Sequence, residues 1–374
     1  MTVITEIFSN ASYVWPLIAL IAFTLTYLLI PRIAHIVNLH GLVDQPNHRS
    51  AHTASTPTMG GIAFYLVLVL IVFAAAHWES EDIALHFIAA LSVIFFIGLR
   101  DDLVSTTPRL KLLGELLACS FILFCSCMEV YSLDGFLGVN GIYPIISYLF
   151  IYLLLLTIIN AFNLIDGIDG LSAVVGIIIF GFFAWFFYQT SWDFYFLLNI
   201  ALIAMLLAFL RFNISSKQKI FMGDTGSLII GFCIGLMTLK FLTIEPVAME
   251  AAFSIKAENK LVVIAAVLII PLLDTVRAMY IRLKEGRSPF SADRNHIHHV
   301  LVNTGLSHIQ ASILLGMINV LVAGLIIFLS TLLDSFQLMV SYALVFVILM
   351  GTFKKIKNQL SPEKKKRPIV RAFK

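Results

Sequence analysis

Residues 149–171 read LFIYLLLLTIINAFNLIDGIDGL, an apolar run that ends in amides and carboxylates. Up to position 159, Thr157 is the only plainly polar residue of the run. Beyond it, polar residues recur at every third position with two glycines among them: Asn160, Asn163, Asp166, Gly167, Asp169 and Gly170. Apolar runs of ~17–25 residues are typical of helices that span a bilayer. The stretch therefore predicts a membrane helix that ends in a polar cluster.

The composition of the whole chain agrees with a membrane protein. Of its 374 residues, 60% are hydrophobic and 13% are charged, whereas a soluble domain has ~25% charged residues. A transmembrane β-barrel would show short segments of alternating hydrophobicity, and this chain has long apolar runs instead. The sequence therefore predicts an all-α integral membrane protein.

The apolar runs predict about eleven transmembrane helices. We expect them near residues 14–31, 60–77, 83–99, 111–130, 145–161, 170–188, 194–211, 226–242, 260–282, 309–330 and 338–353. Residues 1–353 then form a polytopic transmembrane catalytic domain with cytoplasmic active-site loops. Residues 354–374 form a basic cytoplasmic tail, interpreted as a solvated end that can touch anionic lipid.

Lysine and arginine predict the orientation, because they concentrate in cytoplasmic loops. In the eleven-helix arrangement one side receives nearly all of them, and the other receives only Lys240, Lys256 and Lys260. We therefore expect a periplasmic N-terminus and a cytoplasmic C-terminus. All five polar clusters then reach the cytoplasmic face: residues 44–61, 100–103, 160–171, 221–227 and 288–299.

These clusters have the chemistry of a cation site, although each also has a simpler interpretation. The 160–171 segment can be an ordinary capped helix end, and Asp101–Asp102 can be solvated acids. Together with Asp224 they bring five carboxylates to one face, and oxygen ligands of this kind suit Mg²⁺ or Mn²⁺. Gly223 and Gly226 flank Asp224 before a helix whose N-terminus can bind an anion. Asp224 or Thr225 can instead cap that helix.

Two further groups are ambiguous. The histidines of "SADRNHIHH" (291–299) suit hydrogen bonding to phosphate or sugar hydroxyls with help from arginine, although a zinc site and a solvated loop remain alternatives. Asp274 and Arg277 lie three residues apart inside a predicted helix. Intramembrane charges are candidates for function, and the simpler expectation is an ion pair between the two. Glu115, one turn into the fourth predicted helix, is similarly ambiguous.

Taken together, the motifs from Gly41 to about Gly305 resemble the polyprenyl-phosphate N-acetylhexosamine-1-phosphate transferase family. Residues 288–307, SPFSADRNHIHHVLVNTGLS, resemble the branch that uses UDP-GlcNAc. The three-histidine loop of the branch that transfers MurNAc-pentapeptide is absent. One departure is that many members carry a lysine shortly after the histidine that matches His52, where this chain reads HTASTP.

The resemblance implies a reaction and roles for the residues. GlcNAc-1-phosphate would pass from UDP-GlcNAc to undecaprenyl phosphate with release of UMP and with Mg²⁺ (or Mn²⁺) as cofactor. Asn163 and Asp224 would bind the metal. The catalytic set would be Asp101, Asp102, Asp166 and Asp169, with Asp101 as the candidate base. Substrate contacts would come from Asn160, Arg282, Arg294, His296, His298, His299, Asp44 and His52.

The resemblance also implies a location and partners. We expect a multi-pass protein of the bacterial inner membrane that starts O-antigen, common-antigen or related glycan synthesis. The expected partners are UDP-GlcNAc and undecaprenyl phosphate, with no nucleic acid, and a homodimer is left open. Two alternatives remain. The first is the same chemistry on another UDP-N-acetylhexosamine or on UDP-MurNAc-pentapeptide. The second is a secondary transporter or flippase, because broken helices and intramembrane charge suit transport too.

Overall fold

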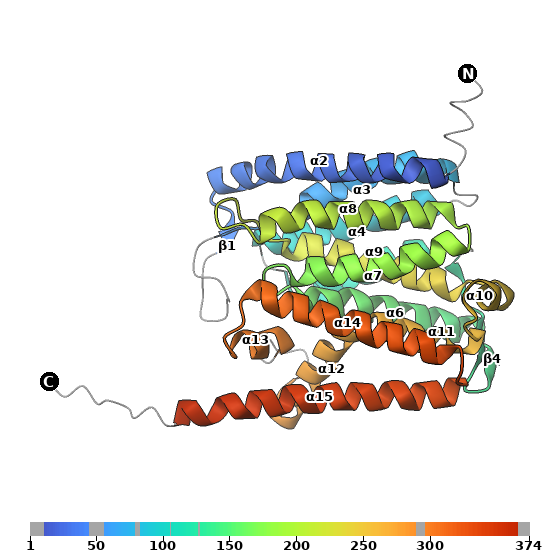
Figure 1. The fold of residues 1–374 in the computed structure, drawn as a ribbon. Coiled ribbons are helices and arrows are strands. Elements are labelled where there is room, and N and C mark those ends of the chain that lie inside the picture. Colours follow the sequence, from blue (N-terminus) through green and yellow to red (C-terminus); the bar gives the residue numbers. More distant parts are fainter. Residues whose placement is uncertain are drawn as a thin grey trace, which may run out of the picture.

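The computed structural model describes residues 11–44, 56–78, 83–104, 106–125, 128–288 and 296–365. The long helices lie side by side along one axis, whereas α12 runs across it; β1 and α13 lie at one end of the bundle and α10 and β4 at the other (Figure 1). The helices of the chain are α2 (Ala11–Leu39), α3 (Gly61–Ala75), α4 (Ile83–Val104), α5 (Pro108–Leu123), α6 (Pro144–Ile165), α7 (Leu171–Gln189), α8 (Asp193–Asn213), α9 (Gly223–Leu242), α10 (Pro246–Phe253), α11 (Lys260–Val267), α12 (Ile269–Lys284), α13 (Ile297–Val302), α14 (His308–Ser330) and α15 (Ser335–Lys365).

Strands are few and short. In the described part of the chain, β1 (Val43–Asp44) pairs with β2 (Thr56–Pro57), and β3 (Ser132–Phe136) pairs with β4 (Val139–Gly141) as a hairpin. The remainder of the architecture is helical, which confirms the predicted fold class of an all-α multi-pass membrane protein.

A helix lies at each predicted position, but some helices differ in length and one predicted span is broken. Among the described residues, nine helices are long and apolar enough to cross a bilayer, or ten if the bent pair α11–α12 counts as one span. The expected helix 111–130 is shorter, because α5 ends at Leu123. The last helix, α15, extends to Lys365 rather than ending near residue 353.

The bend between α11 and α12 has a clear cause. The axes of the two helices differ by 70°, and Pro271 lies four residues after Val267. Proline has no N–H to donate to that carbonyl, and its ring clashes with it. The Asn319 side chain on α14 donates to the freed Val267 oxygen at 3.0 Å. The expected span 260–282 is therefore two helix segments joined by an amide cap from a neighbouring helix.

Helix α9 lies at the centre of the bundle, and every residue from Thr225 to Leu242 is buried. Glycines on its neighbours allow the close approach. A Cβ at Gly61 would lie 2.2 Å from the Gly226 nitrogen, and one at Gly98 would lie 2.5 Å from the Thr225 Cα. Small residues at helix contacts are a common device of membrane proteins. They bring α3 and α4 against the first turn of α9, where Asp224 lies.

Candidate active site

The first turn of α9 is held by a carboxylate from another helix. One Asp102 oxygen accepts the backbone N–H of Asp224 at 2.7 Å, and the other accepts the Thr225 N–H at 3.0 Å and the Thr225 hydroxyl at 2.5 Å. Helix N-termini leave N–H groups unsatisfied, and an anion there is stabilised by the helix dipole. The expectation that Asp224 or Thr225 caps this helix is therefore wrong, since Asp102 of α4 supplies the cap.

Gly223 makes this capping possible. Its φ is +73°, a conformation that favours glycine. A Cβ at this position would lie 2.7 Å from an Asp102 carboxylate oxygen. The glycine before Asp224 thus admits the carboxylate to the helix end.

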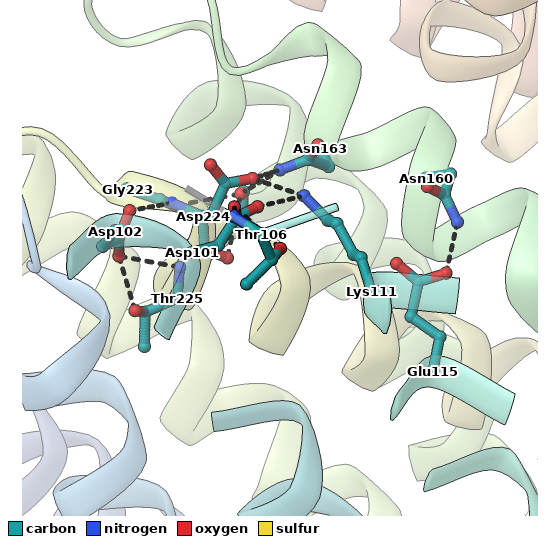
Figure 2. A network of polar contacts seen from close by, with 11 residues as sticks. Asp101, Asp102, Thr106, Lys111, Glu115, Asn160, Asn163, Gly223, Asp224 and Thr225 are labelled. Atoms are coloured by element: carbon teal, nitrogen blue, oxygen red, sulfur yellow. Dashed lines mark hydrogen bonds and ion pairs between the residues drawn. The ribbon is translucent and has the colours of Figure 1, made fainter. Parts of the chain in front are cut away.

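Asp101 points to a different partner. One of its oxygens accepts the backbone N–H and the hydroxyl of Thr106 at 2.6 and 2.9 Å. The other lies 3.1 Å from the Lys111 ammonium, which is also 2.6 Å from an Asp224 oxygen. Figure 2 shows Lys111 of α5 reaching between Asp101 of α4 and Asp224 of α9. The three residues form a continuous charged network between three helices.

Asn163 completes this network from α6. Its amide nitrogen donates to Asp224 at 2.8 Å and to the Ser227 hydroxyl at 2.8 Å. Among the described residues, no hydrogen bond reaches the second Asp224 oxygen or the Asn163 amide oxygen. Carboxylate and amide oxygens are ligands of hard divalent cations. These two atoms therefore fit the expected metal-binding role of Asn163 and Asp224.

The other two aspartates lie in the turn between α6 and α7. Asp166 accepts the Ser172 hydroxyl at 2.6 Å. Desolvation by burial, assisted by the negative charges of Asp224, Asp102 and Asp169, raises the pKa of Asp166 to about 7. A group with this pKa changes charge near neutral pH, as expected for residues that handle charge in active sites.

Asp169 has the opposite electrostatic environment. Its carboxylate lies 2.7 Å from the Lys219 ammonium and 2.9 Å from His308 Nδ1. Burial alone would raise the pKa of Asp169, but these two contacts outweigh burial and lower it. Asp169 is therefore ionised at neutral pH and joins the α6–α7 turn to the 214–222 loop and to α14.

The histidine segment folds over the same region. A Cβ at Gly167 would lie 2.3 Å from the His298 ring, so His298 packs against the α6–α7 turn. Burial lowers the pKa of His298 to about 3, with a further contribution from the neighbouring histidines. The His298 ring is therefore neutral, and neither ring nitrogen has a hydrogen-bond partner within the described residues.

Asp274 holds this segment in place. One Asp274 oxygen lies 2.7 Å from His296 Nδ1, and the other accepts the backbone N–H of Ile297 at 2.6 Å. The expected ion pair between Asp274 and Arg277 is wrong, because the carboxylate turns to His296 instead. The zinc alternative gains no support, since no group of three His, Cys, Asp or Glu side chains in the described part of the chain could hold a metal ion.

The remaining predicted site residues are placed as follows. Arg282 is buried, and one of its guanidinium nitrogens lies 3.5 Å from His296 Nε2. The rings of His298 and His299 are adjacent, with centroids 4.3 Å apart. Asn160 faces α5 rather than the aspartates, because its amide donates to Glu115 at 2.6 Å. His52, Arg294 and the side chain of Asp44 lie outside the described residues.

Several residues of the network were not among the predicted site residues. Lys111, Lys219, His308 and Ser172 each contact a predicted aspartate. Lys111 carried a weak signal in the sequence, because it lies nine residues after Asp102 and precedes an apolar run. Lys219 lies two residues before the FMGDTGS segment, which is a weaker signal, and nothing in the sequence pointed to His308 or Ser172.

Comparisons with known proteins identify the family. A family model described as glycosyl transferase family 4 matches residues 84–242. An Escherichia coli K12 protein named undecaprenyl-phosphate alpha-N-acetylglucosaminyl 1-phosphate transferase is 32% identical over 319 residues, which cover 83% of this chain and 82% of the relative. The chain belongs to glycosyl transferase family 4. Proteins with the same name from Salmonella typhi (30% over 318 residues; 82% and 81% covered) and Haemophilus influenzae (30% over 302 residues; 77% and 79% covered) are also similar.

The region matched by glycosyl transferase family 4 includes the acidic network. It begins in α4 before Asp101 and ends with α9, so it contains Asp101, Lys111, Asn163 and Asp224. The histidine segment and α14 lie beyond it. The Lys111 ammonium and the carboxylate and amide oxygens of Asp224 and Asn163 thus lie together where α4, α5, α6 and α9 meet.

Proposed function

We propose that the protein transfers GlcNAc-1-phosphate from UDP-GlcNAc to undecaprenyl phosphate, forming undecaprenyl-diphospho-GlcNAc and UMP. The relatives from three bacteria support it, because each is named for transfer of N-acetylglucosaminyl 1-phosphate to undecaprenyl phosphate. The observation that carries the proposal is the convergence of Asp101, Lys111, Asn163 and Asp224, from four helices, at the end of a membrane bundle.

The proposed reaction is a phosphoryl transfer between two anions. An oxygen of the lipid phosphate attacks the phosphorus that carries GlcNAc, and the bond from this phosphorus to the oxygen of the departing UMP breaks. Such reactions depend mainly on in-line positioning and on stabilisation of charge. The second pKa of a phosphate is near ~6, so the acceptor is already largely ionised at neutral pH.

Each network residue then has a role. Lys111 supplies positive charge beside the reacting phosphates, and Asp101 holds its ammonium. All of the Asp101 hydrogen bonds go to Thr106 and Lys111, which favours this holding role over that of a base. The free oxygens of Asp224 and Asn163 would bind Mg²⁺ or Mn²⁺, which would neutralise the diphosphate and the UMP leaving group.

The turn between α6 and α7 and the histidine segment around α13 would hold the donor. Neutral His298 and the buried Arg282 lie on the α12–α13 side of the site, where they would contact phosphate or sugar. We propose that this end of the bundle faces the cytoplasm of a bacterium, where UDP-sugars are present. The product would feed O-antigen, common-antigen or a related cell-envelope glycan.

The proposal is tested by incorporation of radiolabelled sugar into lipid. Purified protein in detergent receives undecaprenyl phosphate, Mg²⁺ and one of several donors: UDP-GlcNAc, UDP-GalNAc or UDP-MurNAc-pentapeptide. We expect labelled lipid and UMP from UDP-GlcNAc. Incorporation from another donor alone would refute the donor assignment, and no incorporation from any donor would refute the transferase.

A matched pair of variants tests the site. Asp224→Asn should abolish UMP release, since it removes a charged ligand oxygen from the network. Asp334→Asn makes the same chemical change at an exposed position between α14 and α15, and asparagine also caps helices well. We expect this control to retain full activity. An active Asp224→Asn protein would refute the metal assignment.

A further inference from the structure

One buried carboxylate next to the site has no role in the reaction described above. Glu115 of α5 is only 1% exposed. One of its oxygens accepts the Asn160 amide at 2.6 Å, and the other has no hydrogen-bond partner among the described residues. Leaving a carboxylate oxygen buried without a partner costs free energy. The free Glu115 oxygen can therefore accept a hydrogen bond or an ion pair.

Lys111 is the donor that Glu115 can reach. It lies four residues earlier on α5, and residues four apart share a helix face. Side chains on a helix lean toward its N-terminus, so Glu115 leans toward Lys111. Figure 2 shows the Lys111 side chain between the Asp101–Asp224 pair on one side and Glu115 on the other.

The position that Lys111 now occupies conflicts with a bound metal. Its ammonium lies 2.6 Å from an Asp224 oxygen, and Asp224 is the residue that fits a divalent cation. Two cations at one carboxylate repel, so the arriving metal would displace the ammonium. Lys111 is partly buried, with a side-chain exposure of 17%, and leaving Asp224 would cost it one of its two ionic partners. A Lys111 ammonium displaced from Asp224 would keep Asp101 and would be stabilised by a second carboxylate in place of Asp224.

We propose that Glu115 is this second partner, a positioning residue that receives the Lys111 ammonium when a divalent cation binds at Asp224. The proposal rests on the proposed function only for the presence of a metal at Asp224. Lys111 would keep Asp101 within reach and exchange Asp224 for Glu115. The exchange would also leave the lysine beside the metal, where the phosphates are expected.

A purely structural role is the competing explanation, since the Glu115–Asn160 bond joins α5 to α6. The chain offers a matched control for this. The Ser120 hydroxyl on α5 lies 2.8 Å from the Tyr152 hydroxyl on α6, so Ser120→Ala also removes a polar contact between these helices. This variant leaves the charges near Asp224 unchanged.

The test is a double-mutant cycle on Mn²⁺ affinity, with free Mn²⁺ measured by electron paramagnetic resonance on purified protein without donor or acceptor. Glu115→Gln should weaken Mn²⁺ binding by about tenfold, a coupling typical of contacting residues. Lys111→Met should tighten it, because the competing ammonium is gone. In the Lys111→Met background, Glu115→Gln should have no effect. Ser120→Ala should bind Mn²⁺ with the same affinity as the unmodified protein.

The cycle separates the two explanations. Equal losses of Mn²⁺ affinity from Glu115→Gln in both backgrounds, or no loss in either, would overturn the proposal. Absence of any Mn²⁺ binding would overturn the proposal for Glu115 as well. The separate sugar-transfer assay shows whether the proposed function fails with it. Glu115→Asp, which keeps the charge but shortens its reach, provides a second variant and should give a smaller loss than Glu115→Gln.

Discussion

Replacing Asp102 by asparagine separates a capping role from a chemical one. The carboxylate accepts three hydrogen bonds from the first turn of α9. Asparagine has one acceptor oxygen, so its amino group would face at least one N–H donor. A hydrogen bond to a charged group contributes about 1.5–3 kcal/mol, and the charge at a helix N-terminus adds about 0.3–1 kcal/mol. We therefore expect Asp102→Asn to destabilise the protein by about 3 kcal/mol.

The assay is thermal unfolding in detergent, followed by intrinsic fluorescence without donor or divalent cations. At about 2 °C per kcal/mol for a large domain, Tm should fall by about 6 °C. Thr225→Val is the control, because it removes only the hydroxyl contact and leaves both backbone hydrogen bonds. Its Tm should fall by about a third as much. An Asp102→Asn protein that has the same Tm as the unmodified protein but has lost transfer activity would refute the capping argument.

Three further predictions concern residues at and away from the site. Because burial raises the pKa of Asp166 from its ordinary value of 3.8 to about 7, the folded state binds more protons than the unfolded state between these values, so stability falls as the pH rises through this range and is lowest above pH 7. Asp166→Asn should therefore raise Tm more at pH 8 than at pH 5, and an equal change at both would contradict this. Gly98→Ala should lower both Tm and activity, since its Cβ would lie 2.5 Å from Thr225 Cα; unchanged unfolding would contradict the close packing. Lys260→Met, at the opposite end of the bundle, removes the ion pair with Asp134 and hydrogen bonds to two backbone carbonyls. It should lower the free energy of unfolding by about 3 kcal/mol while the folded protein still transfers sugar. Loss of activity in the folded variant would count against a purely structural role for Lys260.

The sequence predicts the helices well because hydrophobicity along the chain is a local property. The run ending in the Asn160–Leu171 segment is α6, followed by the turn into α7. The bend at Leu268 was not predicted. Pro271 lies in the interior of the predicted helix 260–282, where proline kinks or breaks a helix, so the sequence carried a signal that the prediction did not use; the Asn319 cap comes from another helix and could not be predicted.

The partners of the charged residues were less predictable, because tertiary packing decides them. Asp101 and Asp102 are identical in type and adjacent in sequence. Consecutive residues on a helix do not face the same way, so Asp101 turns to Lys111 of α5 and Asp102 to the N-terminus of α9. Their separate roles follow from which helices pack on the two sides of α4. Similarly, spacing paired Asp274 with Arg277, whereas the structure pairs it with His296 from a later segment.

The capping of α9 also limits where the phosphates of the proposed donor could bind. A free helix N-terminus is a ready anion site, but here Asp102 takes the N–H groups of Asp224 and Thr225. The charge of a diphosphate must therefore be met by side chains. Lys111 is already paired with Asp101 and Asp224, and Lys219 with Asp169, so neither lysine carries much uncompensated positive charge. Under the proposed function, a divalent cation at Asp224 would add positive charge to that of the paired lysines and of Arg282.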